Sequence, residues 1–295
     1  MSSTPFGRVL TAMITPFDSE GAVDYGAVAE LALHLVENGS DGIVVAGTTG
    51  ESPTLSGDEK VALFKGVVDA VGDKGMVLAG TGTYDTAESV HLTERACEIG
   101  VHGVMAVTPY YSRPPQQGLF EHFSAIADAS SVPVLLYNIP SRTGRLIEVE
   151  TLARLAAHER IAAVKDAVGD LAFTTNTRLA CPDDFAIYSG DDILTLPMMS
   201  VGAVGIVSVA SHLAGNEIAE MVAAAASGDW DRARVLHLAL APLFSSLFVE
   251  PNPIPVKAAM DAMWRPVGRP RLPLVPARDE TVEKIKEALA GARAV

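Results

Sequence analysis

The chain alternates short apolar segments with longer segments that have helical spacing. The apolar runs are rich in β-branched residues and too continuous for strands with a solvent-facing side, so they predict buried parallel strands. Between most of them lie segments of helical spacing such as 24–39 and 86–100, and the second ends in Gly100, a residue type that commonly stops a helix. The apolar runs occupy residues 9–15, 41–47, 75–80, 101–107, 132–138, 161–167, 185–190 and 204–210.

This alternation predicts an α/β fold, a (β/α)8 TIM barrel with a C-terminal helical extension. A doubly wound open sheet is the alternative, but it usually has fewer strands, and no G-x-G-x-x-G follows the first strand here. After the eighth apolar run the helical spacing continues to the end, interrupted by the proline-rich connector 265–278. We expect a barrel carrying the active site over residues 1–225 and a C-terminal helical domain over residues 226–295.

Charge and composition narrow the range of partners. Lys and Arg total 22 against 36 Asp and Glu, a net charge of -14, which argues against nucleic acid and anionic membranes as partners. The start "MSSTPFGRVL" lacks the order of a secretory signal, and no apolar run reaches the length of a membrane span. We therefore expect a cytoplasmic protein with no membrane partner, in which an anionic substrate needs locally placed cations or amide donors.

Cysteine and histidine usage gives no sign of a metal or redox site. Cys97 and Cys181 are too few for a disulfide framework and are interpreted as packing residues. The seven histidines are scattered and form no H-E-x-x-H or His-x-His arrangement, so a metal-dependent aldol reaction has no candidate ligands. The adjacent Asp191 and Asp192 are expected to cap the next helix. We predict no metal and no cofactor.

Lys165 in "AAVKDAVGD" is the residue that the strand pattern explains least. It ends the sixth apolar run, where a strongly hydrated ammonium is costly unless it is paired or loses its proton. The structural alternative is a core lysine paired with Asp166, but neighbouring residues in a strand point to opposite faces. A desolvated amine with a lowered pKa is the nucleophile that forms a Schiff base with a ketone or aldehyde. Lys257 is the rival lysine, although it lies in the helical tail.

The loops that follow the strands are where a barrel places its chemistry. "AGTTGES" offers backbone amides and two hydroxyls at Thr48 and Thr49, and the alternative is a tight turn with capping threonines. Tyr111 follows the fourth strand, either as interface packing or as a catalytic phenol. Tyr137 ends the fifth strand, and Arg142 follows in a Pro and Gly loop, where it can bind a carboxylate or remain a surface charge.

Six motifs occur in an order that resembles one known family. "GTTGES", "VTPYYSRP", "YNIPSRTG", "VKDA", "SGDD" and "EPNPIPVK" resemble the dihydrodipicolinate synthase family of pyruvate-dependent class I aldolases, over nearly the whole chain. The resemblance implies a barrel with a C-terminal helical domain, assembled as a homotetramer that is a dimer of dimers. It implies a lyase that condenses pyruvate with L-aspartate 4-semialdehyde, without a cofactor, in lysine and diaminopimelate biosynthesis.

The same resemblance implies a role for each candidate residue. Lys165 would form an imine with pyruvate, and the turn at Thr48 and Thr49 would hold the pyruvate carboxylate. Arg142 would engage the incoming semialdehyde. The implied proton relay consists of Thr49, Tyr137 and Tyr111, the last reaching in from a neighbouring subunit, and the implied substrate-binding set is completed by Gly190 and Val207.

Two other functions remain open on the sequence. One keeps the imine chemistry with another aldehyde, as in N-acetylneuraminate lyase or 2-keto-3-deoxy-sugar-acid aldolases, and Arg142 favours a short carboxylated aldehyde over these. The other is a catalytically silent barrel acting as a binding protein, and a retired site has no physical reason to keep a costly buried amine at Lys165.

One group of residues departs from the family pattern. Family members that lysine inhibits bind it at the tight-dimer interface with two histidines and an asparagine among other residues, and the matching positions here are Gly57, Lys60 and Tyr84. Glu88 and Tyr110 remain from that pattern. A cation at Lys60 would repel the ammonium of free lysine, so we expect weak or absent feedback inhibition.

Overall fold

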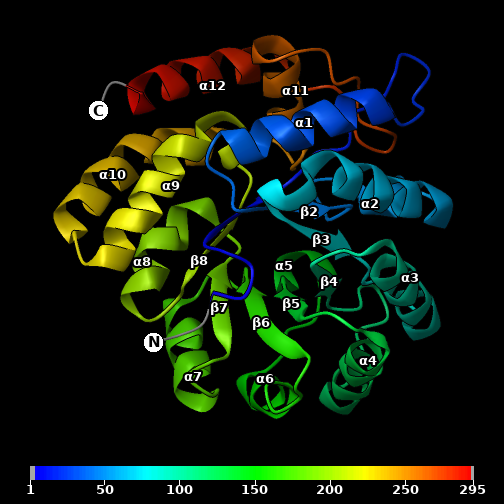
Figure 1. Cartoon of the computed structure of the whole chain (residues 1–295). Helices are drawn as coiled ribbons and strands as arrows, with labels where there is room; N and C mark the ends of the chain where they lie inside the picture. Colours follow the sequence, from blue (N-terminus) through cyan, green and yellow to red (C-terminus); the bar gives the residue numbers. More distant parts are fainter. Residues whose placement is uncertain (1–3, 294–295) are drawn as a thin grey trace.

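The computed structural model describes residues 4–293, and its centre is a closed barrel of eight parallel strands (Figure 1). Each strand pairs with the next along the chain, and β1 closes the ring on β8, with Leu10 opposite Val207. The predicted barrel and all eight strands are confirmed, each at or inside its predicted run. The strands are β1 (Val9–Ala12), β2 (Gly42–Val45), β3 (Met76–Gly80), β4 (Gly103–Val107), β5 (Val134–Asn138), β6 (Ile161–Asp166), β7 (Ala186–Ser189) and β8 (Gly205–Ser208).

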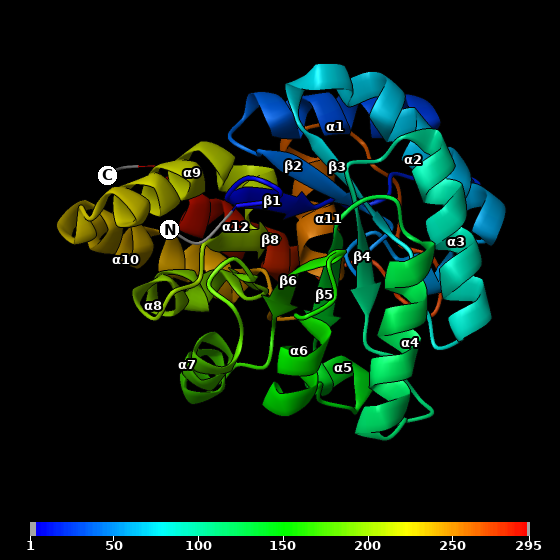
Figure 2. The same cartoon turned by 60° about the horizontal axis from the view of Figure 1, so that its bottom comes forward.

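Helices surround the strands, and local sequence sets where they begin and end (Figure 2). Asp24 caps the first helix by accepting from the Ala27 N–H, and Gly100 stops the third in the left-handed conformation. The helices up to β8 are α1 (Tyr25–Glu37), α2 (Gly57–Val71), α3 (Thr86–Ile99), α4 (Gln116–Ala129), α5 (Pro140–Thr143), α6 (Val149–Leu155), α7 (Leu171–Ala180) and α8 (Thr195–Ser200). Three short 3-10 helices, η1 (Ser52–Thr54), η2 (Gly72–Lys74) and η3 (Asp192–Leu194), lie in the loops.

The C-terminal part forms the four helices that the spacing predicted. They are α9 (Ser211–Ser227), α10 (Trp230–Ser246), α11 (Ile254–Met263) and α12 (Asp279–Ala292). Helix α10 packs against α9 and α12, and residues 265–278 form the expected connector without regular helix (Figure 1). The proposed boundary between residues 225 and 226 falls in the last turn of α9.

The barrel interior is filled by its own set of buried side chains. This inner cluster includes Leu10, Leu78, Tyr137, Tyr188 and Val207, and it is separate from the apolar layer between strands and helices. A filled barrel leaves room for a ligand only at its end, and the loops after the carboxyl ends of the strands are where barrel enzymes bind substrate. Tyr137 is at that end of the interior.

Candidate active site

Lys165 lies near the end of β6, with its side chain inside the barrel. It pairs in register with Tyr137 on β5 and with Tyr188 on β7, and only 5% of it is exposed. Its Nζ lies 4.1 Å from the centre of the Tyr137 ring. Burial lowers the pKa of Lys165 to about 7, the nearby Asp192 carboxylate opposes that shift, and Arg142 adds to it. A large fraction of this amine is therefore neutral near pH 7, the form that attacks a carbonyl.

Asp166 does not neutralise this lysine. Its carboxylate accepts a hydrogen bond from Thr174 Oγ1 at 2.7 Å and another from the Val168 N–H at 3.0 Å. These partners belong to the loop and helix outside the barrel, on the opposite face of β6 from Lys165. The structure thus agrees with the argument from strand alternation.

Gly190 leaves the space that Lys165 occupies. It follows β7, and a Cβ at this position would lie 3.1 Å from Lys165 Cε and 2.7 Å from Ala167 Cβ. Any side chain here would push against the lysine. Gly190 therefore shapes the pocket by having no side chain.

The two aspartates after Gly190 behave differently from one another. Asp191 accepts from the Ile193 N–H at 3.3 Å and caps η3, as expected. Asp192 is instead buried and accepts from the Ser208 hydroxyl and from the Val209 N–H, so the expectation that both cap the next helix is wrong for Asp192. Burial raises the pKa of Asp192 to about 6.

The Thr48–Thr49 turn follows β2, and the side chains of its two threonines have different neighbours. The Thr48 side chain lines the same pocket as Tyr137, and its hydrogen-bonding influence acts to lower the pKa of that phenol. Thr49 is buried, and its Oγ1 accepts from Asn252 Nδ2 at 3.0 Å. Thr48 is therefore the threonine seen to act on Tyr137, while the place in the relay that the resemblance implies for Thr49 stays a prediction.

Tyr137 is a buried phenol that keeps its proton. Only 4% of the residue is exposed, and burial raises its pKa to about 12, although Arg142 and the Thr48 hydrogen bond act in the opposite direction. At neutral pH its hydroxyl is a proton donor beside the Lys165 amine. Proton donors and acceptors within reach of the reacting atoms are what general acid–base catalysis requires.

Two adjoining pockets open at this end of the barrel. One has a volume of about 200 Å³ and is lined by Gly47, Thr48, Tyr110 and Tyr137, among others. The second has a volume of about 400 Å³, and its lining includes Gly190 and Asp191. Arg142 lines both pockets, and its Nη2 donates to the Asn252 carbonyl at 3.2 Å.

Tyr111 and Val207 lie apart from these pockets in the single chain, whereas Lys165 and Thr49 are not lining residues themselves but adjoin the lining residues Tyr137 and Thr48. Tyr111 is 95% exposed, with a positive φ of 70° that turns the chain after Tyr110. Val207 is buried in the inner cluster of the barrel. The structure thus gathers Lys165, Tyr137 and the turn at Thr48, with Arg142 at the junction of the two pockets.

The C-terminal part contributes residues that sequence reasoning did not assign to the site. Asn252 contacts both Thr49 and Arg142, and its only signal was its position in the proline-rich run "EPNPIPVK". Lys257, the rival nucleophile, donates to Glu51 Oε1 at 2.7 Å and to the Thr15 carbonyl at 2.9 Å. Its amine is held by these two partners, and the residue is only 1% exposed.

Within residues 4–293, no three His, Cys, Asp or Glu side chains are grouped as ligands for a metal ion. Both cysteines are free, Cys181 being buried and Cys97 partly buried. No helix in this described range is long and apolar enough to cross a membrane.

Comparison with known proteins matches this chain to named enzymes. Residues 5–292 match the Dihydrodipicolinate synthetase family. The 4-hydroxy-tetrahydrodipicolinate synthase of Heliobacterium modesticaldum is 55% identical over 96% of this chain and 95% of its own length, and that of Synechococcus elongatus is 53% identical over 97% and 95%.

Solved structures of such enzymes have the same fold. The dihydrodipicolinate synthase of Bacillus anthracis superposes with a TM-score of 0.93 at 48% identity, covering 98% of this chain and 99% of that one. The enzyme of Cyanidioschyzon merolae, solved with lysine bound, gives a TM-score of 0.96 at 45% identity, covering 99% of this chain and all of that one.

Proposed function

Because the chain belongs to the dihydrodipicolinate synthetase family, we propose that the Lys165 site condenses pyruvate with L-aspartate 4-semialdehyde. The chain is a lyase of the class I aldolase type, acting in lysine and diaminopimelate biosynthesis, and its product is 4-hydroxy-tetrahydrodipicolinate. The observation that carries the assignment of roles is the buried Lys165 amine, with its pKa lowered to about 7, beside a protonated phenol.

The chemistry begins with the Lys165 amine. The neutral amine attacks the keto carbon of pyruvate, and loss of one water gives an imine, whose protonated nitrogen makes the pyruvate methyl group acidic. Removal of a methyl proton gives an enamine, which attacks the aldehyde carbon of the semialdehyde. The amine of that substrate then displaces Lys165 and closes the ring, so two substrates give one cyclic product and one water.

The remaining residues serve binding and proton transfer. Tyr137 moves protons to and from the oxygen that leaves as water, and the threonine pair of the turn continues the relay. Thr49 is the member that the resemblance implies, and Thr48 is the one that acts on Tyr137. Backbone amides of the Thr48–Thr49 turn hold the pyruvate carboxylate, which suits a protein of net charge -14 that must bind an anion locally. Gly190 keeps room for Lys165, and Val207 belongs to the buried inner cluster that also contains Tyr137.

Assembly and location belong to the same proposal. The exposed Tyr111 at the rim suits a residue that completes the relay of a neighbouring subunit. We propose a homotetramer built as a dimer of dimers and located in the cytoplasm, with no nucleic acid or membrane as partner. Sedimentation velocity would measure the assembly, and a monomer at working concentrations would contradict it.

Arg142→Ala tests the second substrate. Arg142 lies where the two pockets meet, so its guanidinium is placed for a carboxylate that arrives after pyruvate. We expect the variant to lose about 10- to 100-fold in kcat/KM for the semialdehyde, because one charge-assisted contact to a carboxylate is worth roughly 1.5 to 3 kcal/mol. Adduct formation with pyruvate alone should change much less.

A companion experiment measures turnover of the unaltered enzyme with several different aldehydes. Turnover should be fastest with aspartate semialdehyde and slow with N-acetylmannosamine or glyceraldehyde, the aldehydes of the alternative aldolases. Equal losses in the two Arg142→Ala assays would give this arginine a structural role. Faster turnover with a sugar aldehyde would move the chain to the other aldolase class.

Little inhibition by free lysine is expected at millimolar concentration. Lys60 is buried, and burial lowers its pKa, while the neighbouring Glu88 carboxylate opposes that shift. Gly57 lies close to Glu88, because a Cβ at this position would be 3.7 Å from Glu88 Oε1. As a glycine, it has no side chain that could contact a ligand there. The carboxylate that could bind an incoming ammonium therefore already has a cation beside it, and repulsion between like charges about 4 Å apart costs roughly 1 to 4 kcal/mol.

A steady-state titration with lysine measures this directly. Half-inhibition below about 1 mM, which corresponds to a binding free energy near -4 kcal/mol, would contradict the prediction. Lys60→Ala is the informative variant, because it removes the repelling cation and should bring inhibition closer to that range. The Cyanidioschyzon merolae enzyme, solved with lysine bound, is a positive control for lysine binding measured alongside.

A further inference from the structure

A buried ion pair joins the C-terminal part to the loop that follows β2. Lys257 on α11 and Glu51 after the Thr48–Thr49 turn are 206 positions apart in sequence, and their Nζ and Oε1 atoms are 2.7 Å apart. Both side chains are 1% exposed. Removing two charges from water is expensive, and the attraction between them often fails to compensate, so stability alone does not explain such a pair.

A second residue of the C-terminal part, Arg271, holds the other oxygen of the same carboxylate through its backbone. The backbone N–H of Arg271 donates to Glu51 Oε2 at 2.8 Å. The Arg271 guanidinium donates to the Thr54 carbonyl at 2.8 Å and forms an ion pair with Glu59 at 2.6 Å. The loop after the turn is thus held at Glu51 and Thr54, and the first turn of α2 is held at Glu59.

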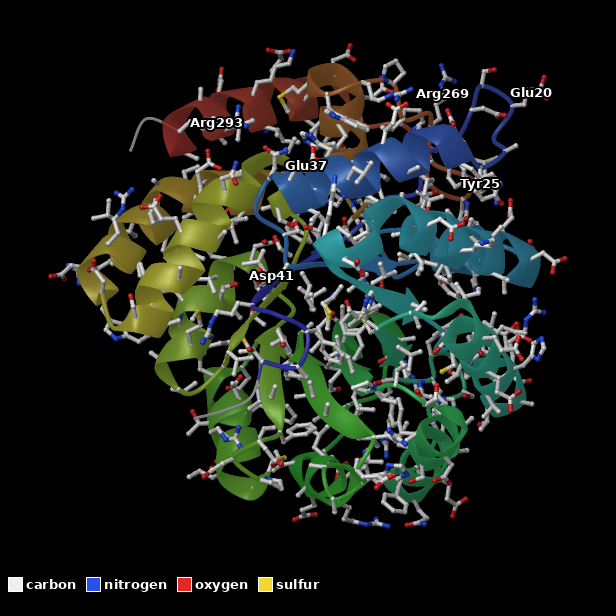
Figure 3. All side chains as sticks on the ribbon, viewed as in Figure 1. Glu20, Tyr25, Glu37, Asp41, Arg269 and Arg293 are labelled. Carbon is white, nitrogen blue, oxygen red and sulfur yellow. The ribbon has the colours of Figure 1, made fainter. Side chains whose placement is uncertain are left out.

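An aromatic ring fixes the two cations in relation to each other. Lys257 Nζ lies 3.9 Å from the centre of the Phe17 ring, and Arg271 Cζ lies 4.5 Å from it. Phe17 is itself tied to the connector, because its N–H donates to the Val267 carbonyl at 2.9 Å. Figure 3 shows Arg269 of the same connector on the side of the molecule that carries Glu20 and Tyr25.

The backbone of Glu51 needs such support. Its φ of 58° and ψ of 36° are left-handed, a conformation that costs energy for a residue with a side chain. In this conformation the Glu51 N–H donates to the Thr48 carbonyl at 3.1 Å, which closes the turn. The shape of the turn therefore depends on a strained residue whose carboxylate is bound on both oxygens by the C-terminal part.

We propose that Lys257 and Arg271 are positioning residues that act through Glu51. They hold the Thr48–Thr49 turn in the conformation whose amides bind the carboxylate of the keto acid. The proposal rests on the function proposed above and extends it, because it makes the C-terminal helices part of the pyruvate half of the site. Neither Lys257 nor Arg271 touches substrate in this arrangement.

The test separates binding of pyruvate from the other steps. Lys257→Met should raise the KM for pyruvate at least tenfold, equivalent to about 1.4 kcal/mol, and should weaken pyruvate adduct formation measured without the semialdehyde. The KM for the semialdehyde should stay within about twofold of the parent. Arg265→Met is the matched control, because Arg265 also joins the C-terminal part to the barrel, through Glu30 on α1, but contacts nothing in the turn.

A double variant keeps the test decisive if the unpaired Glu51 carboxylate prevents folding. Glu51→Gln with Lys257→Met removes both buried charges, so its thermal midpoint should recover toward that of the parent while the KM for pyruvate stays raised. A parental KM in the folded double variant, or an equal rise for both substrates, would overturn the proposal. A parent enzyme that forms no adduct with pyruvate would instead refute the proposed function.

Discussion

Replacing Lys165 by methionine is expected to abolish the pyruvate adduct and to lower turnover by roughly 10⁴-fold or more, the scale of removing a covalent nucleophile. Methionine has a similar length and no amine, so the barrel keeps its packing but loses the only step that activates pyruvate. Incubation with pyruvate and borohydride, followed by mass spectrometry, should find one reduced adduct per parent chain and none on the variant. Peptide mapping of that adduct to Lys257 would overturn the assignment.

The pH dependence of the same step follows from the lowered pKa. The pKa of Lys165 is about 7, against an ordinary 10.5, because burial disfavours its charged form. Adduct formation in the parent should therefore be nearly constant above pH 7 and fall about tenfold per pH unit below it, since only the neutral amine attacks.

The Lys165→Met variant should also be more stable than the parent, and the gain should depend on pH. Below about pH 7 the amine is charged in both folded and unfolded chains, so the full cost of burying the charge is present. Between pH 7 and 10.5 the unfolded chain binds a proton that the folded chain does not, so parental stability rises with pH. Denaturant titrations at pH 6.5 and 9.5 should show the larger difference at pH 6.5.

The fold was predictable because parallel strands inside a barrel leave a strong mark on sequence. Runs such as 132–138 are apolar on both faces, since one face meets the barrel interior and the other meets the helices. The observed strand β5 begins two residues later, at Val134, because Val132 and Pro133 still belong to the incoming loop. Element boundaries depend on local hydrogen bonds that an apolar pattern does not encode.

The buried lysine was predictable for a similar reason. A lysine at the end of a buried strand contradicts the pattern around it, and Lys165 proved to be 5% exposed with its pKa lowered. Tyr137 and Arg142 followed from their places after a neighbouring strand, because carboxyl ends of parallel strands meet at one end of the barrel.

The orientation of individual hydroxyls was not predictable. Thr48 and Thr49 are adjacent and identical in type, and only the folded turn shows that Thr48 acts on Tyr137 while Thr49 contacts Asn252. Asp192 was misplaced for the same reason, because its partners on β8 are 16 positions or more away. Contacts between distant segments, like that of Glu51 with Lys257, have no local signal.

The second large expected effect is the loss of turnover when the Tyr137 hydroxyl, which lies near Lys165 and Thr48, is removed. Tyr137→Phe is expected to lower kcat by about 10² to 10⁴, the usual contribution of a positioned general acid or base. The change keeps the ring that lies 4.1 Å from Lys165 Nζ and removes only the hydroxyl on which Thr48 acts. The pyruvate adduct should still form on Lys165, but slowly, because loss of water from the amine adduct no longer has a nearby proton donor.

Tyr188→Phe supplies the control that separates this role from packing. Tyr188 flanks Lys165 on the other side, on β7, but its hydroxyl donates to the Gly7 carbonyl at 2.8 Å and stays away from the pockets. Its loss should lower the thermal midpoint and leave kcat within about twofold, since a single buried hydrogen bond contributes roughly 1 kcal/mol to stability. Stopped-flow measurement of adduct formation, with steady-state turnover on the same samples, compares the two variants. If both lost rate equally, the phenol of Tyr137 would be a structural neighbour of Lys165, and its relay with Thr48 would have to be abandoned.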